Sequence, residues 1–158
     1  MGDCRPRRGV ASGRLTGMTP HVWEQRVSLA DLDFHRHVNN ARMLAWVQDS
    51  WADMAATAEG VPPAFVAVQH TARYQAPLPY QRRVRIETTV TKLGRSSVTG
   101  IARITDGSVI FAEITSTWVG VDPVRQRPRA LTDVERESFG RHQIEEPLVP
   151  VAAAQLAG

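Results

Sequence analysis

The sequence is poor in cysteine, lysine and long apolar runs. Cys4 is its single cysteine, which excludes an intrachain disulfide and a cysteine-rich metal site and favours a reducing, cytoplasmic compartment. No segment has the apolar length of a signal-peptide core or a membrane span, so we expect no membrane insertion. Lys92 is the one lysine among 19 basic residues, and this arginine bias is more typical of codon composition than of recognition.

Most of the chain also has no excess of positive or negative charge. The net charge of +3 comes from residues 1–17, which hold four arginines against Asp3, and the acidic and basic side chains that follow are balanced. A balanced body gives no electrostatic case for binding nucleic acid. The length suits one domain. We expect a disordered basic leader at 1–17, a domain at 18–140 and a flexible tail at 141–158.

Hydrophobic periodicity predicts one long helix after a first strand. Apolar and polar residues alternate over 21–29, as in a strand. Apolar residues then recur at helical spacing in a segment without glycine or proline until Gly60, and Asn39 or Asn40 is placed to cap its start. The predicted apolar stripe consists of Leu44, Val47, Trp51, Met54, Ala55 and Ala58. We expect the Trp46 and Trp51 pair to serve core packing or a dimer contact.

The second half of the chain reads as strands joined by short turns. The predicted strands cover residues 65–74, 83–91, 96–104 and 109–121, and the sequence T-D-V-E at 132–135 forms a capping box for a short helix. A lone amphipathic helix next to an antiparallel sheet can bury its stripe against that sheet, which predicts an α+β fold with an exposed sheet edge suited to dimer formation. We expect His70 to be a satisfied core histidine. The three arginines of the tail are expected on a solvated face: Arg125, Arg127 and Arg129.

Polar residues cluster where the long helix begins, in the stretch D-L-D-F-H-R-H-V-N-N. In an extended segment Asp31, Asp33, His35 and His37 share one side. A helix N-terminus offers unpaired N–H groups that suit a developing oxyanion, a carboxylate beside it can act as base or nucleophile, and an imidazole can orient either partner. This combination suits acyl transfer, in its simplest form the hydrolysis of an ester or thioester.

Simpler interpretations of the same residues remain open. Asn39 and Asn40 suit helix caps, and Asp31 suits a solvated turn or an Asx-type brace. The pair of histidines at 35 and 37 could ligate a metal together with Asp33, although no further ligand sits at suitable spacing.

The stretch DLDFHRHVNNARMLAWVQDSW resembles the opening signature D-x-D-x-x-G-H-V-N-N-x-x-Y-L of the hotdog-fold acyl thioesterases, the 4-hydroxybenzoyl-CoA thioesterase-like and acyl-ACP thioesterase-like group. The resemblance continues through VQHTARYQAPLPYQRRVRIETTVTKLGRSSV and GVDPVRQRPRALTDVER, so it covers about residues 20–138. It implies a hotdog fold, in which a five-stranded antiparallel sheet wraps one long central helix and a short C-terminal helix follows. It also implies a homodimer or homotetramer with active sites at the subunit interface.

The resemblance assigns roles by position. Asp33 falls on the catalytic carboxylate, His37 on the histidine of the motif, and His35 on an asparagine that helps to bind substrate in the plant acyl-ACP branch. The N–H near Asn40 falls on the oxyanion donor, and Asp49 on an acidic position of the helix. No metal or organic cofactor is implied. Arg36 and Met43 replace a glycine and a tyrosine, and Arg36 would be strained if the turn needs φ above zero.

The sequence therefore predicts a cytoplasmic thioesterase that acts on acyl-CoA or acyl-ACP in fatty acid metabolism. The acyl chain is expected beside Leu44 and Val47, with Asn39 nearby. Arginines are assigned to the phosphates of the carrier, namely Arg82, Arg83 and Arg95. The alternative is a non-catalytic hotdog protein that binds acyl-CoA or a partner.

Overall fold

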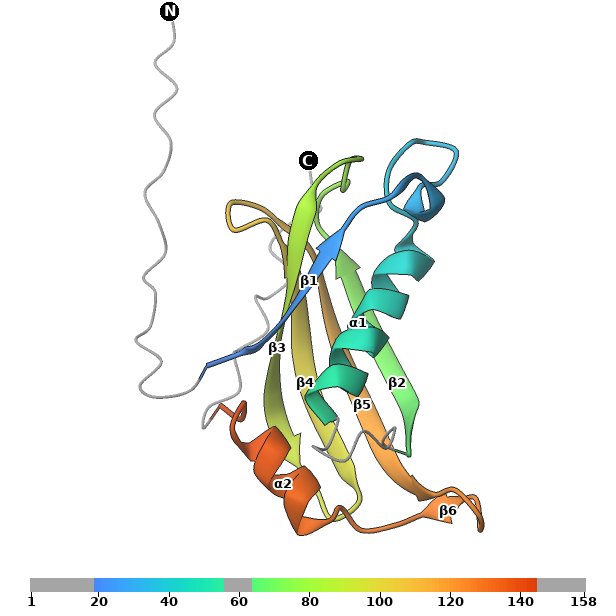
Figure 1. Ribbon diagram of the computed structural model, residues 1–158, viewed down its shortest axis with the longest axis vertical. Helices are drawn as coiled ribbons and strands as arrows, with labels where there is room; N and C mark the ends of the chain where they lie inside the picture. Colours follow the sequence, from blue (N-terminus) through green and yellow to red (C-terminus); the bar gives the residue numbers. More distant parts are fainter. Residues whose placement is uncertain (1–18, 56–63, 145–158) are drawn as a thin grey trace, which may run out of the picture.

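The computed structural model of the protein describes residues 19–55 and 64–144. Within them an antiparallel sheet curves around one long helix, as Figure 1 shows. The predicted leader at 1–17, Ala58 and most of the predicted tail lie outside the described residues. No helix in the described ranges is both long and apolar enough to cross a bilayer.

The elements follow the predicted order. They are β1 (His21–Arg26), a 3-10 turn (Leu29–Asp31), α1 (Asn40–Ala55), β2 (Phe65–Tyr74), β3 (Arg83–Leu93), β4 (Ser97–Thr105), β5 (Ile110–Asp122), β6 (Arg127–Pro128) and α2 (Asp133–Gly140). The strands of the main path lie in the order β1-β3-β4-β5-β2, and each neighbouring pair is antiparallel. The predicted α+β hotdog fold is confirmed. The two-residue β6, which pairs with β5, was not expected.

The core lies between α1 and the concave face of the sheet. One side of α1 is buried, and its residues are Met43, Trp46, Val47, Ser50, Trp51, Met54 and Ala55. Burial of each large apolar side chain contributes about 1.5–3 kcal/mol, and both tryptophans are core residues, as predicted. Gly100 leaves no room for a Cβ, which would clash with the Thr89 carbonyl oxygen of β3 and lie 3.0 Å from the Trp51 ring of α1. Leu44 is only partly buried.

The start of α1 is capped by Asn39, one of the two predicted caps. Its Oδ1 accepts a hydrogen bond from the N–H of Ala41 at 2.8 Å. Asn40 is consequently the first residue of the helix. A cap of this kind stabilises a helix by about 1 kcal/mol.

Two predictions on single side chains are wrong. His70 is exposed on β2 rather than part of the core, although its Nδ1 does find a partner in the Ser116 hydroxyl at 2.9 Å. Arg129 does not belong to a solvated face: it forms two hydrogen bonds of 2.6 and 2.8 Å with the carboxylate of Glu135. Glu135 is also the acid of the predicted capping box with Thr132, which is confirmed.

Candidate active site

Residues 33–37 form a tight turn just before α1. Leu32 pairs with Val38 in a β-bridge, the N–H of Asp33 donates to the His37 carbonyl at 2.9 Å, and the N–H of Arg36 donates to the Asp33 carbonyl at 3.0 Å. Arg36 has a φ of 63°. The expected extended segment with alternating side chains is therefore wrong, because the chain reverses direction within it.

Asp31 fixes this turn against the helix and does not share a face with Asp33. Its buried carboxylate accepts hydrogen bonds from the N–H and hydroxyl of Ser28, at 2.7 and 2.6 Å, and from Arg42 at 2.9 Å. Its carbonyl accepts the N–H of Asn39 at 2.8 Å. Burial alone would raise the pKa of Asp31, but these hydrogen bonds outweigh burial and hold the pKa below its usual value. The brace interpretation of Asp31 is thus the correct one.

The carboxylate of Asp33 is oriented by the turn that carries it. Its Oδ1 accepts the N–H of His35 at 2.8 Å and lies 3.4 Å from the N–H of His37. No hydrogen bond to its Oδ2 is found within the described ranges. One oxygen is therefore used to hold the geometry, and the other is available to a water molecule or a substrate.

A cavity of about 550 Å³ opens between this turn, the start of α1 and the segment after β2. Its lining residues are Asp33, His35, His37, Val38, Asn40, Met43, Tyr74, Gln75, Ala76, Pro77 and Leu78. Its volume is that of a small-molecule site, and it combines an apolar floor with a few convergent polar groups. The structure thus brings all four predicted catalytic residues to one cavity. The Asn40 N–H, the first of α1, has no acceptor in the described part of the chain.

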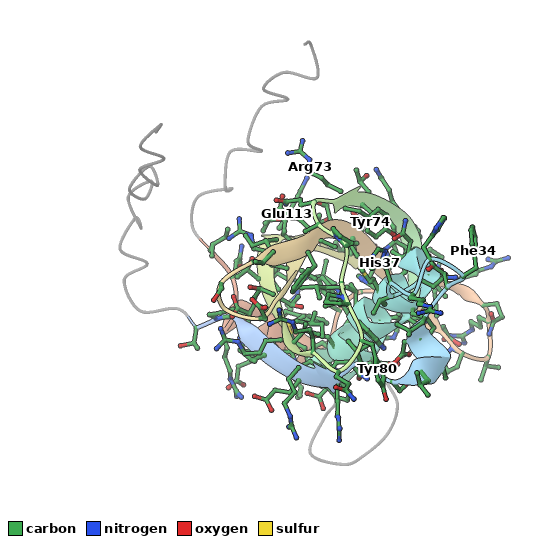
Figure 2. The ribbon with its side chains drawn as sticks, turned by 90° about the horizontal axis from the view of Figure 1, so that it is seen from above. Phe34, His37, Arg73, Tyr74, Tyr80 and Glu113 are labelled. Carbon is green, nitrogen blue, oxygen red and sulfur yellow. The ribbon has the colours of Figure 1, made fainter. Side chains whose placement is uncertain are left out.

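Tyr74 is a cavity residue that the sequence analysis did not assign. It ends β2, and its hydroxyl donates to the Asn40 carbonyl at 3.3 Å. Burial raises the pKa of the Tyr74 phenol. Figure 2 shows its side chain close to His37. The signal was present in the sequence, since Tyr74 lies in the stretch VQHTARYQAPLPYQRRVRIETTVTKLGRSSV that carries part of the resemblance.

Comparison with known proteins adds to this geometry. Residues 35–110 match the family model of the Thioesterase superfamily. The match covers just under half of the 158 residues, and over that range the chain is similar to this superfamily. This similarity supports a thioesterase activity, and the matched residues include His35, His37, Asn40 and Tyr74. No curated protein matches the chain.

Solved structures share the fold of this chain. The PA5185 protein from Pseudomonas aeruginosa is 21% identical with a TM-score of 0.74, and the match covers 82% of this chain and 96% of that one. A thioesterase from Thermus thermophilus, complexed with coenzyme A and Zn, is 24% identical with a TM-score of 0.66, and the match covers 77% of this chain and 98% of that one. At such identities the likeness concerns the fold.

None of the predicted substrate-binding residues is among the described residues that line the cavity. Asn39 caps the helix, Val47 is fully buried in the core, and Asp49 is exposed further along α1. The arginines are divided between the two ends of the sheet. Arg82, 3.4 Å from Asp106, and its neighbour Arg83 lie at the end where α1 begins, whereas Arg95 lies beside α2 at the other end (Figure 1).

Two observations bear on the metal interpretation of His35 and His37. His35 stacks on Phe34, with ring centroids 3.9 Å apart, and Phe34 points away from the body of the molecule in Figure 2. No three His, Cys, Asp or Glu side chains in residues 19–55 and 64–144 come together in a group that could hold a metal ion.

Replacing Arg36 with glycine is expected to stabilise the protein. A non-glycine residue in the left-handed region costs about 1 kcal/mol, and Arg36 occupies that region. The comparison is with Arg36→Ala, which removes the same side chain but keeps the strain. Chemical denaturation should give Arg36→Gly a free energy of unfolding about 1 kcal/mol above that of Arg36→Ala. Equal values would contradict the strain.

Proposed function

We propose that the protein hydrolyses acyl-CoA thioesters at the cavity of about 550 Å³. The observation that carries the proposal is the meeting of the free Asp33 carboxylate oxygen and the first N–H of α1 at one partly apolar cavity. A carboxylate supplies a base or nucleophile, and a helix N-terminus supplies oxyanion stabilisation. The thioester carbonyl would lie between them.

Chemistry at this site follows from the two groups. The thioester carbonyl oxygen accepts the Asn40 N–H, which favours the negative charge that develops there during attack. Asp33 either takes a proton from an attacking water or attacks the carbonyl carbon itself and forms an anhydride that water then hydrolyses. In both routes the C–S bond breaks, and the sulfur leaves as a thiolate that is protonated to the free thiol. His35 and His37, at the rim, orient the carbonyl or the carboxylate.

Coenzyme A is proposed as the carrier rather than acyl carrier protein. One structural relative, the Thermus thermophilus thioesterase, was crystallised with coenzyme A. The test is free-thiol release from matched acyl-CoA and acyl-ACP substrates over a series of acyl lengths. Faster hydrolysis of acyl-CoA supports the proposal. Faster hydrolysis of acyl-ACP contradicts the choice of carrier, and saturable acyl-CoA binding without hydrolysis selects the non-catalytic alternative.

The free edge of β2 is proposed to pair with a second copy of the chain. In the described ranges β2 pairs only with β5, and its residues from 66 to 74 are all exposed. A long unpaired edge with apolar side chains invites strand pairing. Because Tyr74 ends this strand, the cavity would lie next to the dimer interface.

A charge on this edge is expected to disrupt the dimer. Val68→Lys places an ammonium group on the edge strand, and Val134→Lys on α2 is a matched control because both valines are 58% exposed. Sedimentation analysis should find the wild type and Val134→Lys as dimers and Val68→Lys as a monomer. A Val68→Lys protein that remains dimeric would place the interface elsewhere.

Removing the Tyr74 hydroxyl is expected to lower kcat about 5-fold, because one hydrogen bond worth about 1 kcal/mol no longer holds the start of α1. Tyr74→Phe keeps the ring, so the fold and KM should change little. Tyr80→Phe is the control, since Tyr80 is the other tyrosine, is similarly exposed, and does not line the cavity. Steady-state kinetics of both variants gives the comparison. An equal effect of the two replacements would refute a specific role for Tyr74.

A further inference from the structure

A second cavity lies toward the C-terminal end of α1, with a volume of about 170 Å³. It shares no lining residue with the cavity at Asp33. Four aromatic side chains from four different elements form its walls, namely Trp51 of α1, Phe65 of β2, Trp118 of β5 and Phe139 of α2. Ligand sites commonly have such apolar and aromatic walls.

The aromatic walls are packed against one another and are thereby fixed in place. The Trp51 centroid lies 5.9 Å from that of Trp118 and 6.1 Å from that of Phe139. Phe65 meets Phe139 edge to face at 5.6 Å. These centroid distances are in the range at which aromatic rings attract one another, and the edge-to-face geometry of Phe65 and Phe139 is a favoured arrangement. Trp51, Trp118 and Phe139 expose only 3%, 5% and 1% of their surface, so these three walls are held firmly in the core.

The lining predicts what kind of ligand fits. No charged side chain lines the cavity in the described part of the chain. An ionic ligand is therefore disfavoured, because it would lose its hydration without gaining an opposite charge. The guanidinium of Arg129 lies 5.7 Å from the centroid of the Phe65 ring, and its charge is already paired with Glu135. Gln48 at the rim offers an amide donor and acceptor.

The volume of the cavity also restricts the size of the ligand. An apolar cavity of about 150 Å³ is known to accept a benzene molecule. The cavity here is slightly larger, so it fits one six-membered ring with a short substituent and is too small for two fused rings.

We infer that this aromatic-walled cavity is a binding site for one uncharged, ring-sized apolar group that carries a polar atom for Gln48. The inference goes beyond the proposed hydrolysis, because the site is formed by other residues. The group is either a free small molecule or the end of an acyl chain. In both cases the cavity would recognise the same uncharged ring and its polar atom.

The indole N–H signals of the protein provide a direct test with benzyl alcohol as the probe. Trp51 and Trp118 line the cavity, whereas Trp23 and Trp46 do not, so the four tryptophans contain their own control. Titration followed by ¹H–¹⁵N NMR should produce saturable shifts of the first two signals and leave the others unchanged. Benzylammonium and naphthalenemethanol should cause no saturable shift. Equal shifts of all four signals, or saturable binding of the charged or two-ring probe, would overturn the inference.

A variant that fills the cavity completes the test. Ala52 is exposed on α1 and lines the cavity, so Ala52→Leu should abolish the benzyl alcohol shifts, and Ala45→Leu on the same helix should not. If the ring ends a long acyl chain, Ala52→Leu also raises KM for 12-phenyldodecanoyl-CoA at least several-fold without changing KM for acetyl-CoA, since Ala52 lies about 18 Å along α1 from Asn40. If the ligand is a free molecule, both KM values stay unchanged. The NMR titration needs no turnover, so it distinguishes failure of this inference from failure of the proposed thioesterase activity. Unaltered benzyl alcohol binding in Ala52→Leu would refute the site.

Discussion

Asp33→Asn is expected to lower kcat for thioester hydrolysis by about 10²- to 10⁴-fold. An amide can neither take a proton from water nor attack a carbonyl, whereas its oxygen can still accept the His35 N–H that holds the turn. The change therefore removes the chemistry and keeps the geometry. KM should change much less than kcat, because the carboxylate acts in the transition state rather than in binding.

Release of free thiol from the best acyl-CoA substrate measures this effect. Glu137→Gln serves as the matched carboxylate-to-amide control: Glu137 lies on α2, is exposed and pairs with Arg141 by an i,i+4 contact of 2.7 Å. Its kcat should equal that of the wild type. Circular dichroism and thermal unfolding should show that both variants are folded. An Asp33→Asn protein that retains a third or more of the wild-type kcat would remove Asp33 from the catalytic assignment.

The overall fold could be predicted because burial imposes a period on the sequence. The stripe along α1 and the alternating strands β3, β4 and β5 each place one face in the core, and that face is readable in the sequence. The segment 33–37 could not be predicted in this way. Its residues alternate in type as a strand would, while its actual path depends on the φ of Arg36 and on a bridge between Leu32 and Val38. Neither of these features produces a periodic pattern in the sequence.

The candidate site was predictable where its residues are neighbours in sequence. Asp33, His35, His37 and Asn40 line one cavity because a turn of a few residues cannot separate them. Residues that meet only through the fold were missed or misplaced. Tyr74 reaches the start of α1 because β2 pairs with β5 at the edge of the sheet, a long-range arrangement that no local pattern encodes.

The same limit explains the error at Arg129. Three arginines at alternate positions of a polar tail suggest a solvated surface, and a capping box suggests that Glu135 is occupied with Thr132. Both inferences use only residues close together in the sequence. The ion pair between the two side chains exists because the chain after β6 turns back into α2, which brings a buried carboxylate to the guanidinium. Such a pair has a large effect on stability when only one partner is removed.

Glu135→Gln is expected to reduce the free energy of unfolding by about 3 kcal/mol. Glu135 is 5% exposed and receives two hydrogen bonds from Arg129, which is itself 27% exposed, so the variant leaves a partly buried cation without its counter-charge. Burial alone would raise the pKa of Glu135, but the hydrogen bonds from Arg129 and Thr132 outweigh burial and lower it. A lowered pKa in the folded state means that this stabilisation is present at neutral pH and is lost as the pH falls through the folded pKa.

Denaturant unfolding of the wild type and of Glu135→Gln from neutral to acidic pH measures both the loss of stability and its dependence on pH. The wild type should lose stability toward acid more steeply than Glu135→Gln, so the difference between them should shrink as the pH falls. A double variant, Arg129→Met with Glu135→Gln, should recover most of the lost stability, because Gln can still accept the Thr132 N–H and no cation is left without its counter-charge. Two results would show that the Arg129–Glu135 pair does not contribute through its charge: equal stability of Glu135→Gln and wild type at neutral pH, or a difference in stability that grows in acid. The position of α2 would then depend on Phe139 and the capping box.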